Sequence, residues 1–260
     1  MALPAQWGPI IGCRSGGQPW EEIPRAGRSL ACGVHRTFSR GRRCLVLEGD
    51  HSYAAGTWAG AAAALRARGP VGLVWVDAHM DSHTPATTPS GAVHGMPLAF
   101  LLGHGPRALT HLYGPAPRIR PEQVVIVGVR SYEAGEAALL DRLGVRVIFM
   151  EEVSRRGLAA VMDEALAIAR RGAAGFGISI DLDAVDPIQA PGVGSPVPGG
   201  LDGGELVAAV GRAARLPGYL GTELAEYSPA LDREGRTRRL ALDLMAAAVG
   251  GKEGGIASGD

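Results

Sequence analysis

Cysteine is scarce in this chain. Cys13, Cys32 and Cys44 are its only cysteines among 260 residues, and no two of them form a CxxC pair. An odd number of isolated cysteines supplies neither a disulfide framework nor a cysteine-based zinc knuckle. The groups that organise a site must therefore be sought among other residue types.

An excess of charge and long apolar runs are missing as well. Lys plus Arg and Asp plus Glu both number 26, so the formal net charge is zero, whereas nucleic-acid and membrane-surface partners usually go with a basic excess. No apolar run approaches the roughly 20 residues that span a bilayer, and residues 1–9 lack the basic and apolar regions of a signal peptide. The sequence predicts a cytoplasmic protein with no nucleic-acid or membrane partner.

Apolar strands alternate with helical segments along most of the chain. This alternation predicts an α/β fold, namely a three-layer, doubly wound, mostly parallel sheet with helices on both faces. The strands are expected at 45–47, 71–76, 123–129, 145–150, 175–181 and 219–224. The helices are expected at 54–68, 96–102, 133–143, 157–171, 203–215 and 236–248.

The two ends of the chain are harder to interpret. Residues 9–13 suit a short strand, and the Gly-, Pro- and Arg-rich stretch that follows, up to Arg43, carries no clear periodicity. Residues 250–260 are glycine-rich and suit a flexible tail. No internal linker divides the chain, so we predict a single domain over 1–260, with 1–44 as its N-terminal segment.

Acidic and imidazole side chains follow three of the predicted strands. Alternate residues of extended backbone project to the same side, and ligands of open parallel sheets bind at the carboxyl ends of the strands. These side chains can therefore converge on one small volume, although the triplet at 77–81 taken alone suits a polar loop equally well. In chain order they are His51, Asp77, His79, Asp81, Asp181 and Asp183.

Six such ligands are too many for one metal ion and about right for two. Carboxylate oxygens mixed with two imidazoles suit Mn²⁺ better than structural zinc or Ca²⁺, with Ni²⁺ or Co²⁺ as alternatives. Two ions roughly 3.5–4 Å apart can share a water, lower its pKa and present hydroxide to an electrophilic carbon. The alternative is that some of these aspartates only cap helices or hold loops.

Four motifs, in this order, resemble the ureohydrolase family, which includes arginase and agmatinase. They are Gly-Asp-His-Ser (49–52), Asp-Ala-His-Met-Asp (77–81), Ser-Ile-Asp-Leu-Asp-Ala-Val-Asp-Pro (179–187) and Glu-Leu-Ala-Glu-Tyr-Ser-Pro (223–229). The resemblance implies two Mn²⁺ ions bridged by Asp77 and Asp181. It gives one ion the further ligands His51 and Asp81, and the other ion the further ligands His79 and Asp183.

The resemblance also implies catalytic roles for His94, Glu226 and Asp81. Glu226 falls where the family receives the guanidinium group, and His94 matches a histidine thought to shuttle protons. Taken alone, His94 would be an ordinary loop histidine and Glu226 a carboxylate that precedes a helix. A carboxylate that pairs with a guanidinium cation and a histidine that protonates the departing amine nevertheless suit hydrolysis of a guanidino carbon.

The loop at 84–95 is more similar to that of arginases than to that of agmatinases. The resemblance implies that Thr88 and Ser90, with His83 nearby, bind an α-carboxylate, and that Glu133, with Glu136 in register, contacts an α-amino group. The match is imperfect: His83 and Ala92 stand where arginases usually have asparagine, and Glu133 replaces a shorter aspartate. Glu48 also departs, because the family usually has glycine before Gly-Asp-His.

The expected function is Mn²⁺-dependent hydrolysis of a linear guanidino compound with release of urea, with L-arginine as the leading substrate and L-ornithine as its product. Another ureohydrolase activity, on agmatine, a guanidino acid or a formimino acid, is the first alternative. Two further alternatives belong to other classes. One is a deacetylase-like enzyme that uses a single zinc, and the other is a non-catalytic subunit of a mixed oligomer. The resemblance implies a homo-oligomer, commonly a trimer or hexamer.

Overall fold

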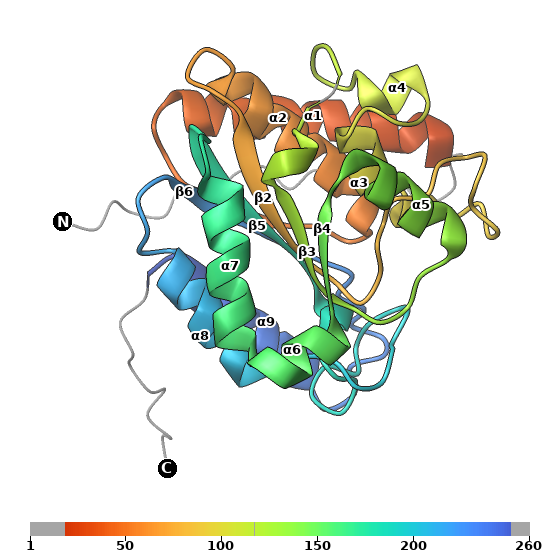
Figure 1. Cartoon of the computed structure of the whole chain (residues 1–260), viewed down its shortest axis with the longest axis vertical. Helices are drawn as coiled ribbons and strands as arrows, with labels where there is room; N and C mark the ends of the chain where they lie inside the picture. Colours follow the sequence, from red (N-terminus) through yellow and green to blue (C-terminus); the bar gives the residue numbers. More distant parts are fainter. Residues whose placement is uncertain (1–18, 117, 251–260) are drawn as a thin grey trace.

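A six-stranded, fully parallel sheet forms the centre of the protein. The computed structural model describes residues 19–116 and 118–250 (Figure 1). The strand order is β1-β6-β5-β2-β3-β4, and every neighbouring pair is parallel. The strands are β1 (Cys44–Leu47), β2 (Val71–Val76), β3 (Val124–Val129), β4 (Arg146–Phe149), β5 (Gly175–Asp181) and β6 (Tyr219–Ala225).

Helices cover both faces of this sheet, so the predicted three-layer α/β fold is confirmed. One core joins the sheet to α6 (Met150–Arg156), α7 (Leu158–Arg170), α8 (Gly203–Ala213) and α9 (Arg236–Ala248). A second core joins the opposite face to α1 (Pro19–Ser39), α2 (Ala54–Leu65), α3 (Pro97–Leu101) and α5 (Ala134–Leu143). Figure 1 shows these two groups of helices on either side of the strands.

The topology reverses between two central strands. From β2 the chain continues to β3 and β4 on one side, whereas from β5 it continues to β6 on the other. Such a reversal opens a crevice at the carboxyl ends of the two strands. Val76 of β2 pairs with Ile180 of β5, so the residues that follow each of them, Asp77 and Asp181, emerge side by side at this crevice.

The described part of the stretch before Arg43, for which the sequence predicted no particular element, does form regular structure. It contains α1, a 21-residue helix with Pro24 inside it. A side chain at Gly56 or Gly60 of α2 would collide with the α1 backbone at Gly27 and Ala31. These small residues therefore let the two helices lie backbone to backbone. The strand predicted at 9–13 lies outside the described residues, as does the predicted tail apart from Gly250.

The other differences from the expected elements are local. The predicted helices match α2, α3, α5, α7, α8 and α9 within a few residues. Two short helices were not predicted: α4 (Arg107–Thr110), and α6, which begins at Met150, where the preceding strand was expected to end. Gly157 (φ 80°) separates α6 from α7.

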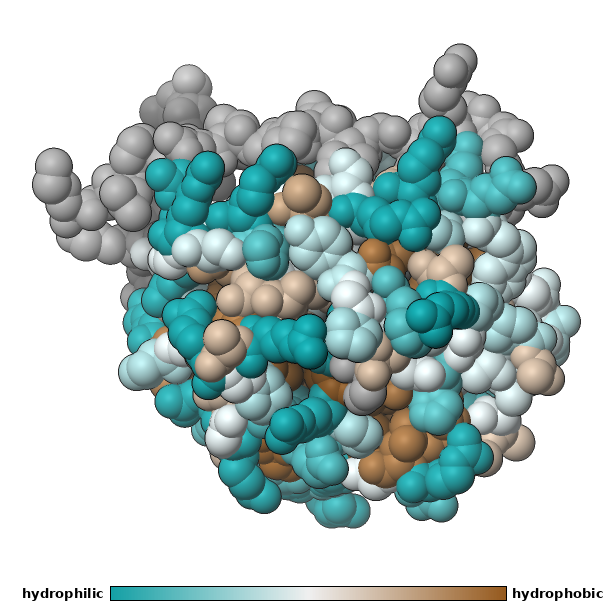
Figure 2. All heavy atoms as spheres, turned by 90° about the horizontal axis from the view of Figure 1, so that it is seen from above, coloured by the Kyte–Doolittle hydropathy of each residue, from teal (hydrophilic) through white to brown (hydrophobic). Residues whose placement is uncertain are grey.

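None of the described helices combines the length and apolar character that crossing a membrane requires. The face seen in Figure 2 is mainly hydrophilic, and hydrophobic residues appear on it as small areas between polar ones. Such a mixture is ordinary for a protein surface.

Candidate metal centre

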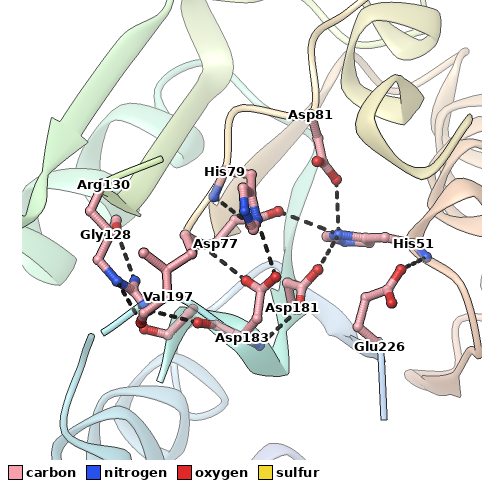
Figure 3. Close-up of polar contacts among 12 residues, drawn as sticks. His51, Asp77, His79, Asp81, Gly128, Arg130, Asp181, Asp183, Val197 and Glu226 are labelled. Atoms are coloured by element: carbon pink, nitrogen blue, oxygen red, sulfur yellow. Dashed lines mark hydrogen bonds and ion pairs between the residues drawn. The ribbon is translucent and has the colours of Figure 1, made fainter. Parts of the chain in front are cut away.

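The six side chains predicted as metal ligands meet at the crevice. Asp77, His79 and Asp81 follow β2, while Asp181 ends β5 and is followed by Asp183 in a single turn of 3-10 helix. His51 begins another such turn after β1. Figure 3 shows all six pointing toward one another from these separate segments.

Asp77 lies between two groups of ligand atoms. Its Oδ2 is 3.4 Å from Nδ1 of His51, and its Oδ1 is 3.5 Å from Nδ1 of His79. Asp181 completes the first group and Asp183 the second, with all ligand atoms of a group within 4.8 Å of one another. One carboxylate shared by two such groups has the geometry of a bridging ligand.

Asp81 faces the first group only. Its Oδ2 lies 3.1 Å from Nδ1 of His51, and Oδ2 of Asp181 lies 3.3 Å from the same nitrogen. Both Oδ2 of Asp81 and Nδ1 of His51 are buried and have no hydrogen-bond partner among the described residues. Buried polar atoms without partners are costly, and a cation between them would satisfy both.

The charged forms of Asp81 and Asp181 are destabilised where no cation is present. Burial, and then the charge of Asp77, raise the pKa of Asp81 to about 8. Burial, with Asp183 and Asp77, also raises the pKa of Asp181 well above its usual value. Burial disfavours a charged His79, but hydrogen bonds to Asp183 and Asp77 raise the pKa of this histidine to about 12. The electric field of the clustered aspartates therefore favours positive charge. The six carboxylate and imidazole ligands fit two divalent cations.

Glu226 and His94 lie beside the first group. Oε1 of Glu226 accepts a hydrogen bond from the backbone N–H of His51 at 2.9 Å, and it lies 3.3 Å from Nδ1 of His94. That contact is the main cause that raises the pKa of His94 to about 9. Burial opposes ionisation of Glu226, but the bond from His94 and then the bond from His51 hold its pKa below the usual value.

Asp81 and Glu226 share an unusual backbone conformation. Their φ angles are 48° and 66°, and among the described residues no other non-glycine residue has a positive φ. Left-handed backbone is uncommon for side chains other than glycine, asparagine and aspartate. Strained backbone of this kind clusters at functional sites, and both residues lie in the crevice.

The residues predicted for the far end of the substrate form a separate cluster at the start of α5. His83 is buried, with Nε2 3.0 Å from Oε2 of Glu133 and 3.5 Å from Oε2 of Glu136. Its Nδ1 lies 3.1 Å from the Thr87 hydroxyl. Glu133 caps α5 in a reciprocal capping box with Glu136. The loop that follows Asp81 is thus held on the first turn of α5.

Thr88 and Ser90 lie further along the same loop. The Thr88 hydroxyl accepts the N–H of Gly91 at 3.0 Å, and the Ser90 hydroxyl accepts the N–H of Ala92 at 3.2 Å. The two hydroxyl oxygens are 3.4 Å apart. This contact is a hydrogen bond in which either hydroxyl can be the donor, so one of the two hydroxyl hydrogens is left that can be directed to an anion.

Sequence reasoning missed several residues that support the cluster. Trp75 donates from Nε1 to Oδ2 of Asp77 at 2.8 Å and stacks on His51 at 4.3 Å between ring centroids. Ser179 and Glu223 lie behind His51. The sequence offered one signal for Ser179 and Glu223, because each is a polar residue inside a mainly apolar strand, β5 or β6. Arg130 was also missed, although it directly follows the end of β3.

The comparisons with known proteins agree with this geometry. A model of the arginase family matches residues 17–250. The chain belongs to the arginase family. It is 42% identical to an arginase of Brevibacillus brevis over 232 residues, which are 89% of this chain and 77% of that relative. It is 40% identical to an arginase of Bacillus subtilis over 223 residues, 86% of this chain and 74% of the relative.

Solved structures extend this likeness. The crystal structure of an arginase from Bacillus cereus matches with a TM-score of 0.85 and 39% identity, covering 90% of this chain and 80% of that one. A formimidoylglutamase from Bacillus subtilis matches with a TM-score of 0.77 and 25% identity, covering 93% and 70%. This arginase-family protein is therefore an arginase-like ureohydrolase, as the motifs indicated.

Proposed function

We propose that this protein uses two Mn²⁺ ions to hydrolyse a linear guanidino compound to an amine and urea. L-Arginine, which would give L-ornithine, is the first candidate substrate. The observation that carries the proposal is the pair of ligand groups that share Asp77. Two adjacent sites with one carboxylate in common suit two ions far better than one.

The proposed ligands divide between the two ions. His51 and Asp81 would hold one ion, His79 and Asp183 would hold the other, and Asp77 and Asp181 would be shared by both. The orphaned Nδ1 of His51 and Oδ2 of Asp81 support the first assignment. When bound, the two ions would lower the pKa of a water and so supply a nucleophile at neutral pH. Ni²⁺ or Co²⁺ in place of Mn²⁺ is compatible with the same ligands.

Glu226 receives the guanidinium group in this mechanism. Its depressed pKa keeps it ionised at neutral pH, and a carboxylate pairs with a planar guanidinium through charge-assisted hydrogen bonds. The backbone N–H of His51 holds the Glu226 carboxylate from behind. The reacting carbon is thus kept next to the metal ligands, where a nucleophile can reach it.

His94 supplies a proton to the departing amine. Its contact with Glu226 keeps the imidazole protonated at neutral pH, because the pKa is raised to about 9. Its side chain is 38% exposed, so it can recover a proton from solvent after each turnover. A positioned histidine of this kind is a common general acid.

Two contacts of the loop at 84–95 and of the start of α5 bear on the far end of the substrate. The one hydroxyl hydrogen that the Thr88–Ser90 pair leaves available favours a substrate that ends in a carboxylate, as arginine does. The contact between His83 and Glu133 favours a second candidate, a guanidino acid without an α-amino group such as 4-guanidinobutyrate. Glu133 already has a partner in His83, and an ammonium group would have to compete with it.

Metal analysis combined with urea release tests the proposal. We expect close to two Mn²⁺ per chain in the wild type and more urea from arginine than from agmatine or 4-guanidinobutyrate, with formamide measured separately for formiminoglutamate. Asp181→Ala should lose both ions and all turnover, whereas Asp163→Ala, an exposed helix position, should change neither. Full activity with two ions in Asp181→Ala would contradict the binuclear assignment, and preference for another compound would replace arginine.

A further inference from the structure

Two buried polar residues lie directly behind His51, on the side away from the carboxylates. Nε2 of His51 is 2.9 Å from the Ser179 hydroxyl, and that hydroxyl donates to Oε1 of Glu223 at 2.8 Å. All three residues have 0% exposed surface. Ser179 of β5 and Glu223 of β6 are direct neighbours in the sheet register, so the backbone fixes this line of contacts.

The direction of these hydrogen bonds follows from counting protons. A serine hydroxyl has one hydrogen, and Ser179 gives it to Glu223. The Ser179 oxygen can then only accept from His51, which requires the proton of the imidazole to sit on Nε2. Oε1 of Glu223 can accept whether or not its other oxygen carries a proton. In the neutral ring, which is the form that can bind a metal ion, Nδ1 of His51 is then left with a bare lone pair.

The geometry at Nδ1 agrees independently. Three carboxylate oxygens lie within 3.4 Å of this nitrogen, yet none satisfies hydrogen-bond geometry, since Nδ1 has no partner among the described residues. An Nδ1–H group would be expected to point at one of these oxygens. A lone pair directed between them is instead the arrangement of a metal ligand.

The imidazole ring is also held from its flat side. The Trp75 ring stacks on it at an interplanar angle of 18°, which restricts tilting, whereas the contact with Ser179 fixes rotation within the ring plane. The same Trp75 donates to Oδ2 of Asp77, the oxygen that faces His51. The ring plane and the tautomer are therefore set by different residues.

We infer that Ser179 and Glu223 are positioning residues that hold His51 in its Nε2–H tautomer and direct its Nδ1 lone pair at one metal ion. The inference rests on the proposed metal assignment. Partners of this kind on the far side of a ligating histidine typically change metal affinity by about 10- to 100-fold. Neither residue touches the substrate in this scheme.

The test measures Mn²⁺ affinity in chelator-treated, refilled protein and requires no turnover. Ser179→Ala removes the acceptor for Nε2–H and should weaken binding of one ion by about 10- to 100-fold while the other ion is held as before. Ser179→Thr keeps a hydroxyl and should restore affinity to within about threefold of wild type. Glu223→Leu removes the acceptor of the Ser179 hydroxyl, which can then turn its hydrogen toward His51, and this variant should weaken binding of the same ion.

Thr222→Val is the matched control. Thr222 is buried in the same strand as Glu223, and its hydroxyl bonds to Tyr219 at 2.6 Å. Its removal costs a buried hydrogen bond without touching His51, so Mn²⁺ affinity should stay within about threefold of wild type. Wild-type affinity for both ions in Ser179→Ala, or an equal loss in Thr222→Val, would overturn the inference.

The two proposals fail in different ways. A wild type that binds two Mn²⁺ but releases no urea from any guanidino compound would refute the proposed function and leave the role of Ser179 testable by affinity. A wild type that releases urea, with Ser179→Ala binding Mn²⁺ normally, would refute the positioning role alone.

Discussion

At the scale of single residues, His94 has the clearest separable role. Its imidazole contacts Glu226 but none of the proposed metal ligands. His94→Ala should therefore lower kcat by about 10²- to 10⁴-fold, the usual contribution of a general acid, with metal content unchanged. Steady-state urea release and metal analysis on the same preparation would measure both.

His104→Ala is the control for that measurement. His104 is a partly buried loop histidine outside the cluster of proposed ligands. The kcat of the His104→Ala variant should therefore match that of the wild type. An unchanged kcat in His94→Ala would return His94 to an ordinary loop residue. A loss of metal in the same variant would instead make His94 part of the metal centre.

Local spacing explains which site residues could be predicted from sequence. Asp77, His79 and Asp81 stand at alternate positions of one five-residue stretch, so the sequence that follows a single strand predicts all three. Ser179 and Glu223 are 44 residues apart and meet only because β5 and β6 pair. His83 and Glu133 are 50 apart, and their contact depends on how a long loop packs on α5. Such contacts carry no local sequence signal.

At the scale of elements, Arg130 links the end of β3 to the loop after β5. Its guanidinium donates to the carbonyl of Asp183 at 2.8 Å, to that of Val197 at 2.8 Å and to that of Ala184 at 3.1 Å. Figure 3 shows it on the opposite side of Asp183 from the ligand atoms. One arginine thus fixes the backbone that presents Asp183.

Replacing this arginine should affect stability and metal binding together. Hydrogen bonds to charged groups contribute about 1.5–3 kcal/mol each, and carbonyls left without donors add to the loss, so Arg130→Met should destabilise by about 2–4 kcal/mol. Arg130→Lys should recover only part of the lost stability, because lysine lacks the planar guanidinium group that donates to several carbonyls at once. Urea denaturation of both, beside Arg155→Met at an exposed arginine, would measure this. Wild-type stability in Arg130→Met would show that the loop holds itself.

The strands were predictable because each is a short, mainly apolar run, as buried parallel strands usually are. The first helix was not, since Pro24, Gly27 and Gly33 all lower helix propensity. Its stability comes from close contact with α2, where Gly27 faces Gly56. Packing between distant segments overrides local preference here, and a single segment read alone does not reveal it.

At the scale of the whole molecule, metal binding and stability should be coupled. Four buried aspartates converge at one end of the sheet, and uncompensated buried charge destabilises a fold. An ion present at about 100 times its Kd adds about 2.7 kcal/mol, so chelation should lower Tm by roughly 5–11 °C. Thermal unfolding with and without Mn²⁺ would measure the shift.

Asp181→Ala separates this effect from general salt effects. Lacking a proposed bridge, its Tm should not respond to Mn²⁺, and neither protein should respond to an equal concentration of Na⁺. A wild-type Tm that is indifferent to chelation would indicate that the fold does not depend on the ions. We also propose that the chain forms a single domain, that it assembles into a homo-oligomer and that it is cytoplasmic.

The left-handed backbone at Asp81 and Glu226 sets stability against activity. Such a conformation costs a side chain such as that of Glu226 about 1–2 kcal/mol and an aspartate less, whereas glycine would adopt it freely. A laboratory selection for heat resistance alone would therefore favour glycine at both positions. It would discard a proposed metal ligand and the proposed guanidinium carboxylate in the same two steps. Selection for stability and selection for hydrolase activity thus favour different residues at these two positions.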